Sequence, residues 1–494
     1  MRKLTVALIT ALLAAGCTLE PKYERPAAPV PQSFPEGKAY HEGDAAPTTG
    51  KAAADIGWRE FFTDARLQQL IELALANNRD LRVAALNVEA QRAQYRIQRA
   101  DLLPTISATA NESVQSVPPY LNKPGLPIPS TIRQYTVGVG FTAYELDVFG
   151  RIRSLTHQQL EQYFGYEETR RSTQISLVAE VADGYLTLLA DQELLRITQE
   201  TLKSDTDSYT LTQRMLESGQ ATELDLRQAE SAVDTARASL AQYTRQVAQD
   251  LNALQLLVGA PLPEELRRGP PLETQSFLEE LPAGLPSDLL ARRPDILSAE
   301  HSLRAANANI GAARAAFFPS VSLTGLFGTS SAQLSGLFGN GSKYWSFNPQ
   351  LSVPIFAGGA NVANLDLAKV QKNLQVAQYE KAIQTAFREV ADALAARGTL
   401  QQQLEAQHAL VDSAGASYTL SEMRFHSGVD AYLTVLDSQR TLYSAQQGLV
   451  SVELTRLENL VGLYKALGGG WEETDSPVAR EHSGPSKQVG ANNF

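Results

Sequence analysis

Cysteine, methionine and ligand-spaced histidine are scarce in this chain, and each scarcity argues against a kind of site. Cys17 is the only cysteine among 494 residues, so no disulfide can form within the chain. Three methionines give no support for a thioether route that would carry Cu(I). The histidines are His41, His157, His301, His408, His426 and His482. They are scattered without ligand spacing, so the sequence predicts no metal site.

Positive charge is also in short supply. The net charge of -11 argues against a nucleic-acid partner. Aromatic residues are few in the long middle segments, where Ala, Gln, Leu and Ser dominate. This composition is typical of long helices that pack closely through small residues, rather than of a globular enzyme core.

The amino terminus has the pattern of an export signal. Arg2 and Lys3 precede an apolar run over residues 4–15, which is too short to span a membrane. Cleavage after residue 16 would make Cys17 the first residue, as in a bacterial lipoprotein, with lipid on its sulfur and amino group. Thr18 is not the Asp that commonly retains lipoproteins at the inner membrane, so outer-membrane sorting is favoured. The alternative is an ordinary signal peptide with a chance cysteine.

The sequence contains an internal duplication. Residues 100–107 are echoed by 315–322, and residues 214–226 by 424–436. Both echoes lie about 210 residues downstream, which is too long a period for a solenoid. The pattern predicts two tandem repeats in one protomer.

Each repeat contains two segments of alternating apolar and polar residues, within about 104–147 and 319–356. Strands of about ten residues with one apolar face are typical of a membrane β-barrel with a wet lumen. A soluble sheet with one buried face gives the same alternation. Tyr135, Tyr344 and Trp345 favour the membrane, since they stand at strand ends where interfacial aromatics belong.

Four strands cannot close a barrel, and an open edge in hydrocarbon leaves backbone groups unpaired. Two protomers would supply about eight strands, whose interior side chains fill. Three would supply about twelve, which is wide enough for a pore. The sequence therefore predicts an oligomer, and a trimer is the smallest that conducts.

The remaining pattern is helical. We expect one helix from Asp64 to Arg99, ended by Pro104, and a long hairpin in each repeat. The first hairpin spans 151–257 with its tip near 218–222, and the second spans 361–467 with its tip near 427–431.

The expected organisation has six parts. They are a signal peptide at 1–16, an extended tether or belt at 17–62, repeat 1 at 63–258, an irregular connector at 259–287, repeat 2 at 288–470 and a disordered tail at 471–494.

The segments 144–151, 290–320, 354–359 and 428–440 closely resemble the TolC-type outer-membrane factor family, in its OprM-like, NodT-type lipoprotein branch. The resemblance covers essentially the whole mature chain. It implies a mixed α and transmembrane-β fold, in which a homotrimer builds a twelve-stranded barrel continuous with a periplasmic α-helical barrel. It also implies two partners, a periplasmic adaptor protein and an inner-membrane transporter of the RND class.

The resemblance places a periplasmic gate on Leu433 and Asp437, with Thr434 where some relatives carry a second Asp. One Asp per protomer around a three-fold axis makes a ring of like charge, which attracts cations and needs nearby donors to stay shut. Asp437 could instead lie on an ordinary solvated helix face.

The helices would be latched by Asp430, Arg424 and Asp225. Phe425 stands where some relatives have a latch tyrosine, so that hydrogen bond is lost. Because the two hairpins differ around these positions, we expect the second one to move.

The hairpin tips carry the paired residues Ser218, Gly219, Ser427 and Gly428. Glycine at a helix end permits a sharp reversal, and the same turns could be the adaptor-docking surface.

Residues 336–343 miss a phosphate-binding loop because Ser342 displaces the lysine. We therefore expect no enzyme activity, and no cofactor apart from lipid on Cys17.

The predicted function is a passive duct that carries drugs or other toxic small molecules from an inner-membrane pump across the outer membrane. One alternative in the same fold is the duct of an ABC-driven type I protein secretion system. Another is a structural lipoprotein with no pore.

Overall fold

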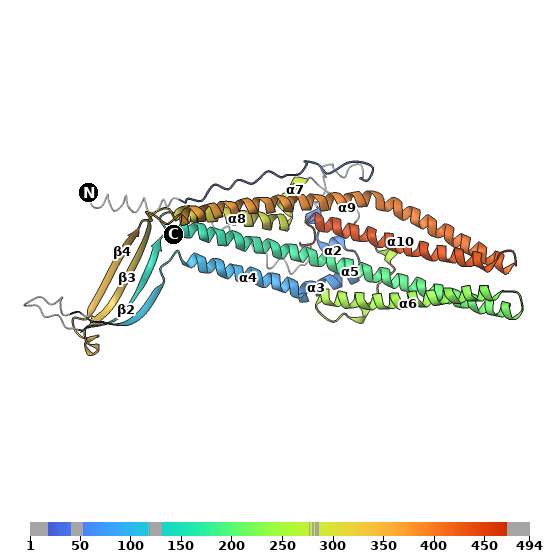
Figure 1. Cartoon of the computed structure of the whole chain (residues 1–494), viewed down its shortest axis with the longest axis horizontal. Coiled ribbons are helices and arrows are strands. Elements are labelled where there is room, and N and C mark those ends of the chain that lie inside the picture. Colours follow the sequence, from blue (N-terminus) through green and yellow to red (C-terminus); the bar gives the residue numbers. More distant parts are fainter. Residues whose placement is uncertain are drawn as a thin grey trace, which may run out of the picture. The chain divides into compact units, whose positions relative to one another are not determined.

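The computed structural model describes residues 18–40, 53–116, 118, 131–275, 277–278, 281 and 286–471 (Figure 1). The helices are α2 (Trp58–Phe61), α3 (Ala65–Asn77), α4 (Arg79–Ala100), α5 (Arg151–Glu217), α6 (Glu223–Val258), α7 (Pro286–Arg292), α8 (Pro294–Ala315), α9 (Ala360–His426) and α10 (Tyr432–Ala466). The strands are β1 (Ile106–Ser116), β2 (Thr131–Leu146), β3 (Ser320–Ser331) and β4 (Lys343–Ser352).

The lengths of these elements confirm the duplication. Helices α4 and α8 each have 22 residues, and α5 and α9 each have 67. Helices α6 and α10 have 36 and 35 residues. Each repeat therefore supplies one helix, two strands and one long helical hairpin in the same order. Within the described residues, no helix is both long and apolar enough to cross a membrane.

The chain forms two compact units. Unit 1 comprises described residues of 1–27, 87–167 and 298–379, and it contains the sheet. Unit 2 comprises described residues of 28–86, 168–297 and 380–494, and it contains the hairpin tips.

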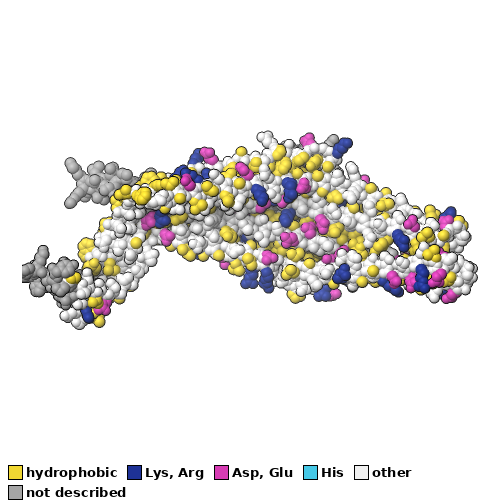
Figure 2. All heavy atoms as spheres, viewed as in Figure 1, with side chains coloured by type: hydrophobic (Ala, Val, Ile, Leu, Met, Phe, Trp, Pro, Cys, Tyr) yellow, Lys and Arg dark blue, Asp and Glu magenta, His cyan; other side chains and the backbone are white. Residues whose placement is uncertain are grey.

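The sheet of unit 1 is antiparallel, with the order β1-β2-β3-β4. Its register aligns one apolar row across all four strands, formed by Ala108, Val139, Phe327 and Trp345. Val139, Phe327 and Trp345 are all more than half exposed. The visible face of the sheet carries few charged side chains over most of its length (Figure 2). The predicted alternation is thus confirmed, and its apolar face lies uncovered in the single chain.

The fourth strand is shorter than the alternating pattern indicates. We expected apolar alternation to continue to Ile355, but β4 ends at Ser352. Its partner β3 begins at Ser320, which pairs with Ser352, so no residue of β3 lies opposite Val353 or Ile355. Ile355 lies outside the strand and is 95% exposed.

The core of unit 2 gathers residues that we expected to lie in the extended tether. Trp58, Phe61 and Phe62 are all at most 1% exposed. Phe61 stacks on Tyr464 at a ring distance of 4.1 Å and lies 5.6 Å from Phe277. Residues 53–62 therefore belong to the packed body, because burying three large aromatic rings removes more apolar surface than an exposed tether could keep in water.

The predicted helix from Asp64 to Arg99 is wrong in one respect, since it breaks at Asn78 into α3 and α4. Asp64 caps α3 as expected by accepting a hydrogen bond from the Arg66 amide. The Asn78 side chain accepts from the Leu81 amide and donates to the Leu257 carbonyl, both at 2.8 Å. Asn can satisfy backbone groups that a continuous helix would satisfy itself, so the break costs little.

Replacing Phe61 by alanine tests whether this aromatic cluster holds unit 2 together. Phe61→Ala removes a fully buried ring from contact with Tyr464 and Phe277. We expect it to lower the free energy of unfolding by about 3–5 kcal/mol per protomer. The measurement is denaturant unfolding followed by helical circular dichroism.

The matched control is Phe338→Ala, since Phe338 is 78% exposed. Its effect should stay within about 0.5 kcal/mol. Equal effects of the two variants would contradict the assignment of residues 53–62 to the core.

Candidate functional site at the helical hairpin tips

The first hairpin reverses at Ser218 and Gly219, between α5 and α6. Gly219 has a φ of +77°, a left-handed conformation that glycine adopts without steric cost. The Gly219 amide donates to the Leu216 carbonyl at 2.9 Å, and the Gln220 amide donates to the Met215 carbonyl at 2.7 Å. These bonds satisfy carbonyls that the helix end would leave unpaired, so the chain can turn back at once.

The second hairpin repeats this geometry at Ser427 and Gly428. Gly428 has a φ of +71°. Its amide donates to the Phe425 carbonyl, and the Val429 amide donates to the Arg424 carbonyl, both at 2.9 Å. The duplicated sequence therefore produces the same turn twice.

The helices that leave the two turns begin differently. Thr222 and Asp225 form a capping box at the start of α6, in which each side chain accepts from the other residue's amide. Ala431 precedes α10 and provides no side-chain cap. A missing cap of this kind costs a helix about 1 kcal/mol. The start of α10 is therefore held less firmly than that of α6.

The proposed latch residues are only partly brought together. Arg424 donates two hydrogen bonds to Asp430, from Nε at 2.6 Å and from Nη2 at 2.8 Å. This pairing lowers the pKa of the Asp430 carboxyl. Asp225, by contrast, accepts from the Thr222 amide at 2.9 Å and from its hydroxyl at 2.6 Å. The structure thus places Asp225 in the cap of its own helix, whereas Arg424 and Asp430 close the second turn.

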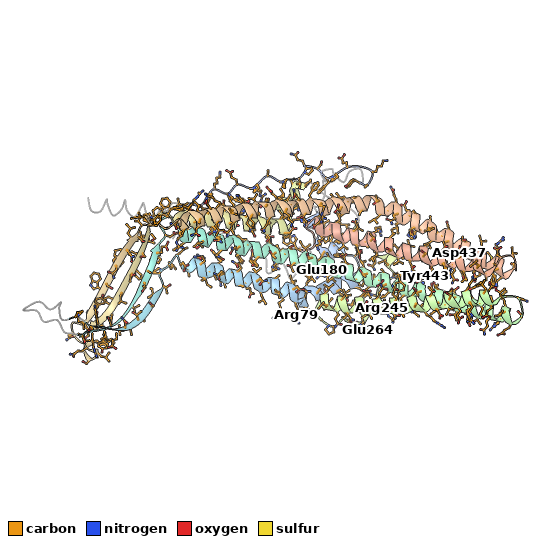
Figure 3. The ribbon with its side chains drawn as sticks, viewed as in Figure 1. Arg79, Glu180, Arg245, Glu264, Asp437 and Tyr443 are labelled. Carbon is orange, nitrogen blue, oxygen red and sulfur yellow. The ribbon has the colours of Figure 1, made fainter. Side chains whose placement is uncertain are left out.

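The predicted gate residues Leu433, Thr434 and Asp437 share one exposed face of α10. The opposite face is buried through Tyr432, Val435, Leu436, Ser438 and Gln439. Asp437 lies near the tip of the hairpin (Figure 3). An exposed row at this spacing can face a shared axis when copies assemble, and the gating role itself remains a prediction.

A polar seam joins the two hairpins, and no pattern in the sequence predicts it. Its side-chain hydrogen bonds are Thr198 to Tyr443 at 2.8 Å, Ser204 to Tyr418 at 3.0 Å and Gln447 to Tyr243 at 2.8 Å. Small residues of α6, among them Ala229 and Ala232, pack beside Tyr432 and Leu436 of α10. The tyrosines of the seam lie on three different helices. No single helix therefore shows a repeated spacing from which the seam could be predicted.

A second polar cluster holds the amino-terminal segment in unit 1. We call residues 18–27 the strap. Asn307 donates to the Pro21 carbonyl at 2.7 Å, and Arg314 donates to the Leu19 carbonyl at 3.2 Å. The predicted lipidation site Cys17 lies outside the described residues, immediately before the strap.

Glu300 is the centre of the strap's contacts, with a side chain that is only 2% exposed. It accepts hydrogen bonds from Arg25 at 2.6 Å and 3.1 Å, from Arg304 at 2.7 Å and from the Tyr23 hydroxyl at 3.2 Å. Burial raises the pKa of Glu300, but the two arginines outweigh it and hold the pKa below its usual value. The carboxylate therefore stays ionised beside its partners.

His157 joins the strap to α5 through Glu20 and Glu161. Hydrogen bonds to Glu161 and Glu20 raise the pKa of His157 to about 10. Although burial opposes ionisation, hydrogen bonds from His157 and His301 lower the pKa of Glu161 to about 2. A raised histidine pKa stabilises fully below its ordinary value of 6.5 and loses that stabilisation as pH rises toward 10. His157 and Glu161 are therefore ionised near neutral pH, and their cluster holds the strap to α5.

Sequence reasoning missed these residues because their partners lie far away along the chain. His157 and His301 read as scattered, yet both contact Glu161, and the strap contacts Glu300 across 275 or more positions. Among the residues that the structure describes, no group of three or more His, Cys, Asp or Glu side chains could hold a metal ion.

Glu300→Gln tests whether the strap is fastened by charge. The amide cannot pair with Arg25 and Arg304 as a carboxylate does, and hydrogen bonds to charged groups contribute about 1.5–3 kcal/mol. We expect trypsin to cleave after Lys22 about tenfold faster in the variant, as measured by the rate at which the peptide ending at Lys22 is released.

Glu24→Gln is the matched control, because Glu24 is exposed on the same strap. It should leave the cleavage rate unchanged. If both variants are cleaved as slowly as the parent, the strap is held by its backbone contacts instead.

Comparison with known proteins places the chain in a family. Residues 70–260 and 285–469 match the family described as outer membrane efflux protein. The chain is 52% identical over 476 residues to the probable efflux pump outer membrane protein TtgC of Pseudomonas putida, covering 96% of this chain and 97% of the relative.

Solved structures agree. A membrane protein from Pseudomonas aeruginosa superposes with a TM-score of 0.85 at 45% identity, covering 93% of this chain and 99% of that one. The open state of the Neisseria gonorrhoeae MtrE outer membrane channel gives a TM-score of 0.84 at 41% identity, covering 93% and 100%. The chain belongs to the outer membrane efflux protein family.

Proposed function

We propose that this protein is the outer-membrane channel of an efflux pump and that it conducts drugs or other toxic small molecules out of the cell. The observation that carries the proposal is the 52% identity with TtgC over nearly the full length of both chains. The MtrE structure, which is similar over 93% of this chain, is described as an outer membrane channel. The duct supplies no bond-making chemistry, so its work is conduction and gating.

The assembly that we propose is a trimer, in which three four-stranded sheets close one barrel of about twelve strands. Two features of the single chain support it. The apolar row through Val139, Phe327 and Trp345 is uncovered, as a lipid-facing surface would be. Strands β1 and β4 form the two edges of the sheet, and edges in hydrocarbon need partners.

The partners that we propose are a periplasmic adaptor and an inner-membrane RND transporter. The two Ser–Gly turns, at Ser218 and Gly219 and at Ser427 and Gly428, would receive the adaptor. Their similar backbone geometry supports this, because one repeated adaptor element could engage both turns.

Deletion of the gene tests the function. Cells that lack it should accumulate a fluorescent pump substrate, and expression of the intact chain should restore export. Retention of a secreted protein, with dye export unchanged, would instead support the type I secretion alternative. A purified oligomer that never conducts in planar bilayers would favour the structural lipoprotein.

Asp437→Ala tests the gate. A unit charge at about 6 Å in water contributes about 0.7 kcal/mol, so we expect the cation-to-anion permeability ratio to fall about threefold. Single-channel conductance should also rise. Alanine is smaller than aspartate, and the constriction loses the carboxylates that nearby hydrogen-bond donors would hold in the shut position. The measurement is single-channel recording in planar bilayers.

Asp207→Ala is the control for this charge change, because Asp207 is an exposed carboxylate on α5. It should leave selectivity and conductance unaltered. An Asp437→Ala channel that is indistinguishable from the parent would show that Asp437 only faces solvent.

Cys17→Ser tests the lipid anchor, which we propose on the basis of the export signal. Labelled palmitate should be incorporated into the parent and not into the variant. Both proteins should still fractionate with the outer membrane, because the proposed barrel provides its own insertion. An unmodified Cys17 thiol in the mature parent would support an ordinary signal peptide.

A further inference from the structure

Asp205 is a carboxylate in an unusual place, buried in unit 2 between the two helical hairpins. It lies on α5, and the residue is only 5% exposed. Beside it is a cavity of about 70 Å³ between α5, α6 and α10, which is large enough to admit water. Its lining includes Thr201 and Asp205 of α5, Ala232 of α6, and Leu436, Gln439 and Tyr443 of α10.

The groups that face Asp205 compensate its charge only in part. Helix α10 contributes Gln439, Arg440 and the phenols of Tyr432 and Tyr443, and α9 contributes Tyr418 with Glu422 next to it. The side chains that α6 adds to the cavity are Ala, Thr and Ser, which carry no charge near neutral pH. Burial raises the pKa of Asp205 to about 6, although Gln439 and Arg440 lower it.

The position of Asp205 matters because α10 both contacts Asp205 at the seam and carries the predicted gate residue Asp437. One face of α10 packs on this seam through Leu436 and Gln439, and the opposite face carries Asp437. Gln439, which faces Asp205, is two residues from Asp437. A change in the packing of the seam must therefore move the helix that carries the predicted gate.

We propose that Asp205 is a proton-operated fastener of α10: with a neutral side chain it holds α10 against α5, and its ionisation draws water into the seam and frees α10 together with Asp437. The inference rests on the proposed channel function only where it concerns the gate.

The direction of the effect follows from linkage. A carboxyl whose pKa is raised by burial favours the closed seam most when it is protonated. As pH rises from the ordinary value of 3.8 through about 6, the closed seam loses that stabilisation. A difference of about two pKa units limits the effect on the opening equilibrium to about 100-fold.

Hydrogen–deuterium exchange of the purified full-length protein tests the proposal without requiring conduction. The probe is the peptide covering residues 432–445, with rates corrected for the intrinsic pH dependence of amide exchange. In the parent we expect exchange about fourfold faster at pH 7.5 than at pH 5.5. Asp205→Asn, which is always neutral, should exchange slowly at both pH values.

Asp207→Asn is the matched control, since it removes an exposed carboxylate two residues away on the same helix. It should keep the parent's pH dependence. Asp183 on α5 also has a pKa raised by burial, to about 7, so the contrast between the Asp205 and Asp207 variants identifies the responsible group.

Arg440→Gln provides a second readout if Asp205→Asn does not fold. Arg440 lowers the pKa of Asp205, so its loss should move the midpoint of the exchange change to higher pH. A parent without pH dependence in this peptide would overturn the proposal, as would an Asp205→Asn protein that keeps it.

Single-channel recording separates the fastener from the channel function. If the exchange results hold and the protein does not conduct, the channel proposal fails and the fastener stands. If the protein conducts with equal open probability at pH 5.5 and 7.5 while α10 loosens, the link from α10 to the gate is wrong.

Discussion

The unpaired edges of the four-stranded sheet are the constraint on which the rest of the structure depends. Among the described residues, strands β1 and β4 each pair on one side only, while their sheet exposes the apolar row of Val139, Phe327 and Trp345. One copy of the chain cannot both cover its apolar row and pair the polar backbone groups at its sheet edges. The proposed trimer satisfies both at once, because neighbouring copies pair the edges and lipid covers the row.

The same need for neighbours explains the composition of the helices. Helices α5 and α9 each run for 67 residues, far beyond the length that one globular core can cover. Helix α6 packs on α10 through small residues such as Ala229 and Ala232, and polar groups join the hairpins between Thr198 and Tyr443 and between Ser204 and Tyr418. Such bonds are specific but add little net stability. A hairpin held in this way can be stable and still change its packing, as a gate requires.

Much of this architecture could be predicted from local pattern. Gly219 and Gly428 marked the turns because a left-handed helix end favours glycine, and Asp64 marked the start of α3 because its side chain caps the helix. Predictions from local sequence pattern were wrong where a residue distant in the chain stabilised a different structure. Asn78 breaks the helix with help from the Leu257 carbonyl, and residues 53–62 are drawn into the core by Phe277 and Tyr464.

By itself, the sequence determined the duplication, the strands and the reversals. The repeated segments can be compared directly along the chain, and each strand or reversal depends on residues within a few positions of one another. Only the tertiary structure decided which charges meet. It joined Glu300 to the strap and buried Asp205 against α10. The reason is physical: a carboxylate's pKa and partners depend on burial and on groups brought close by folding, and their separation along the chain carries no such information.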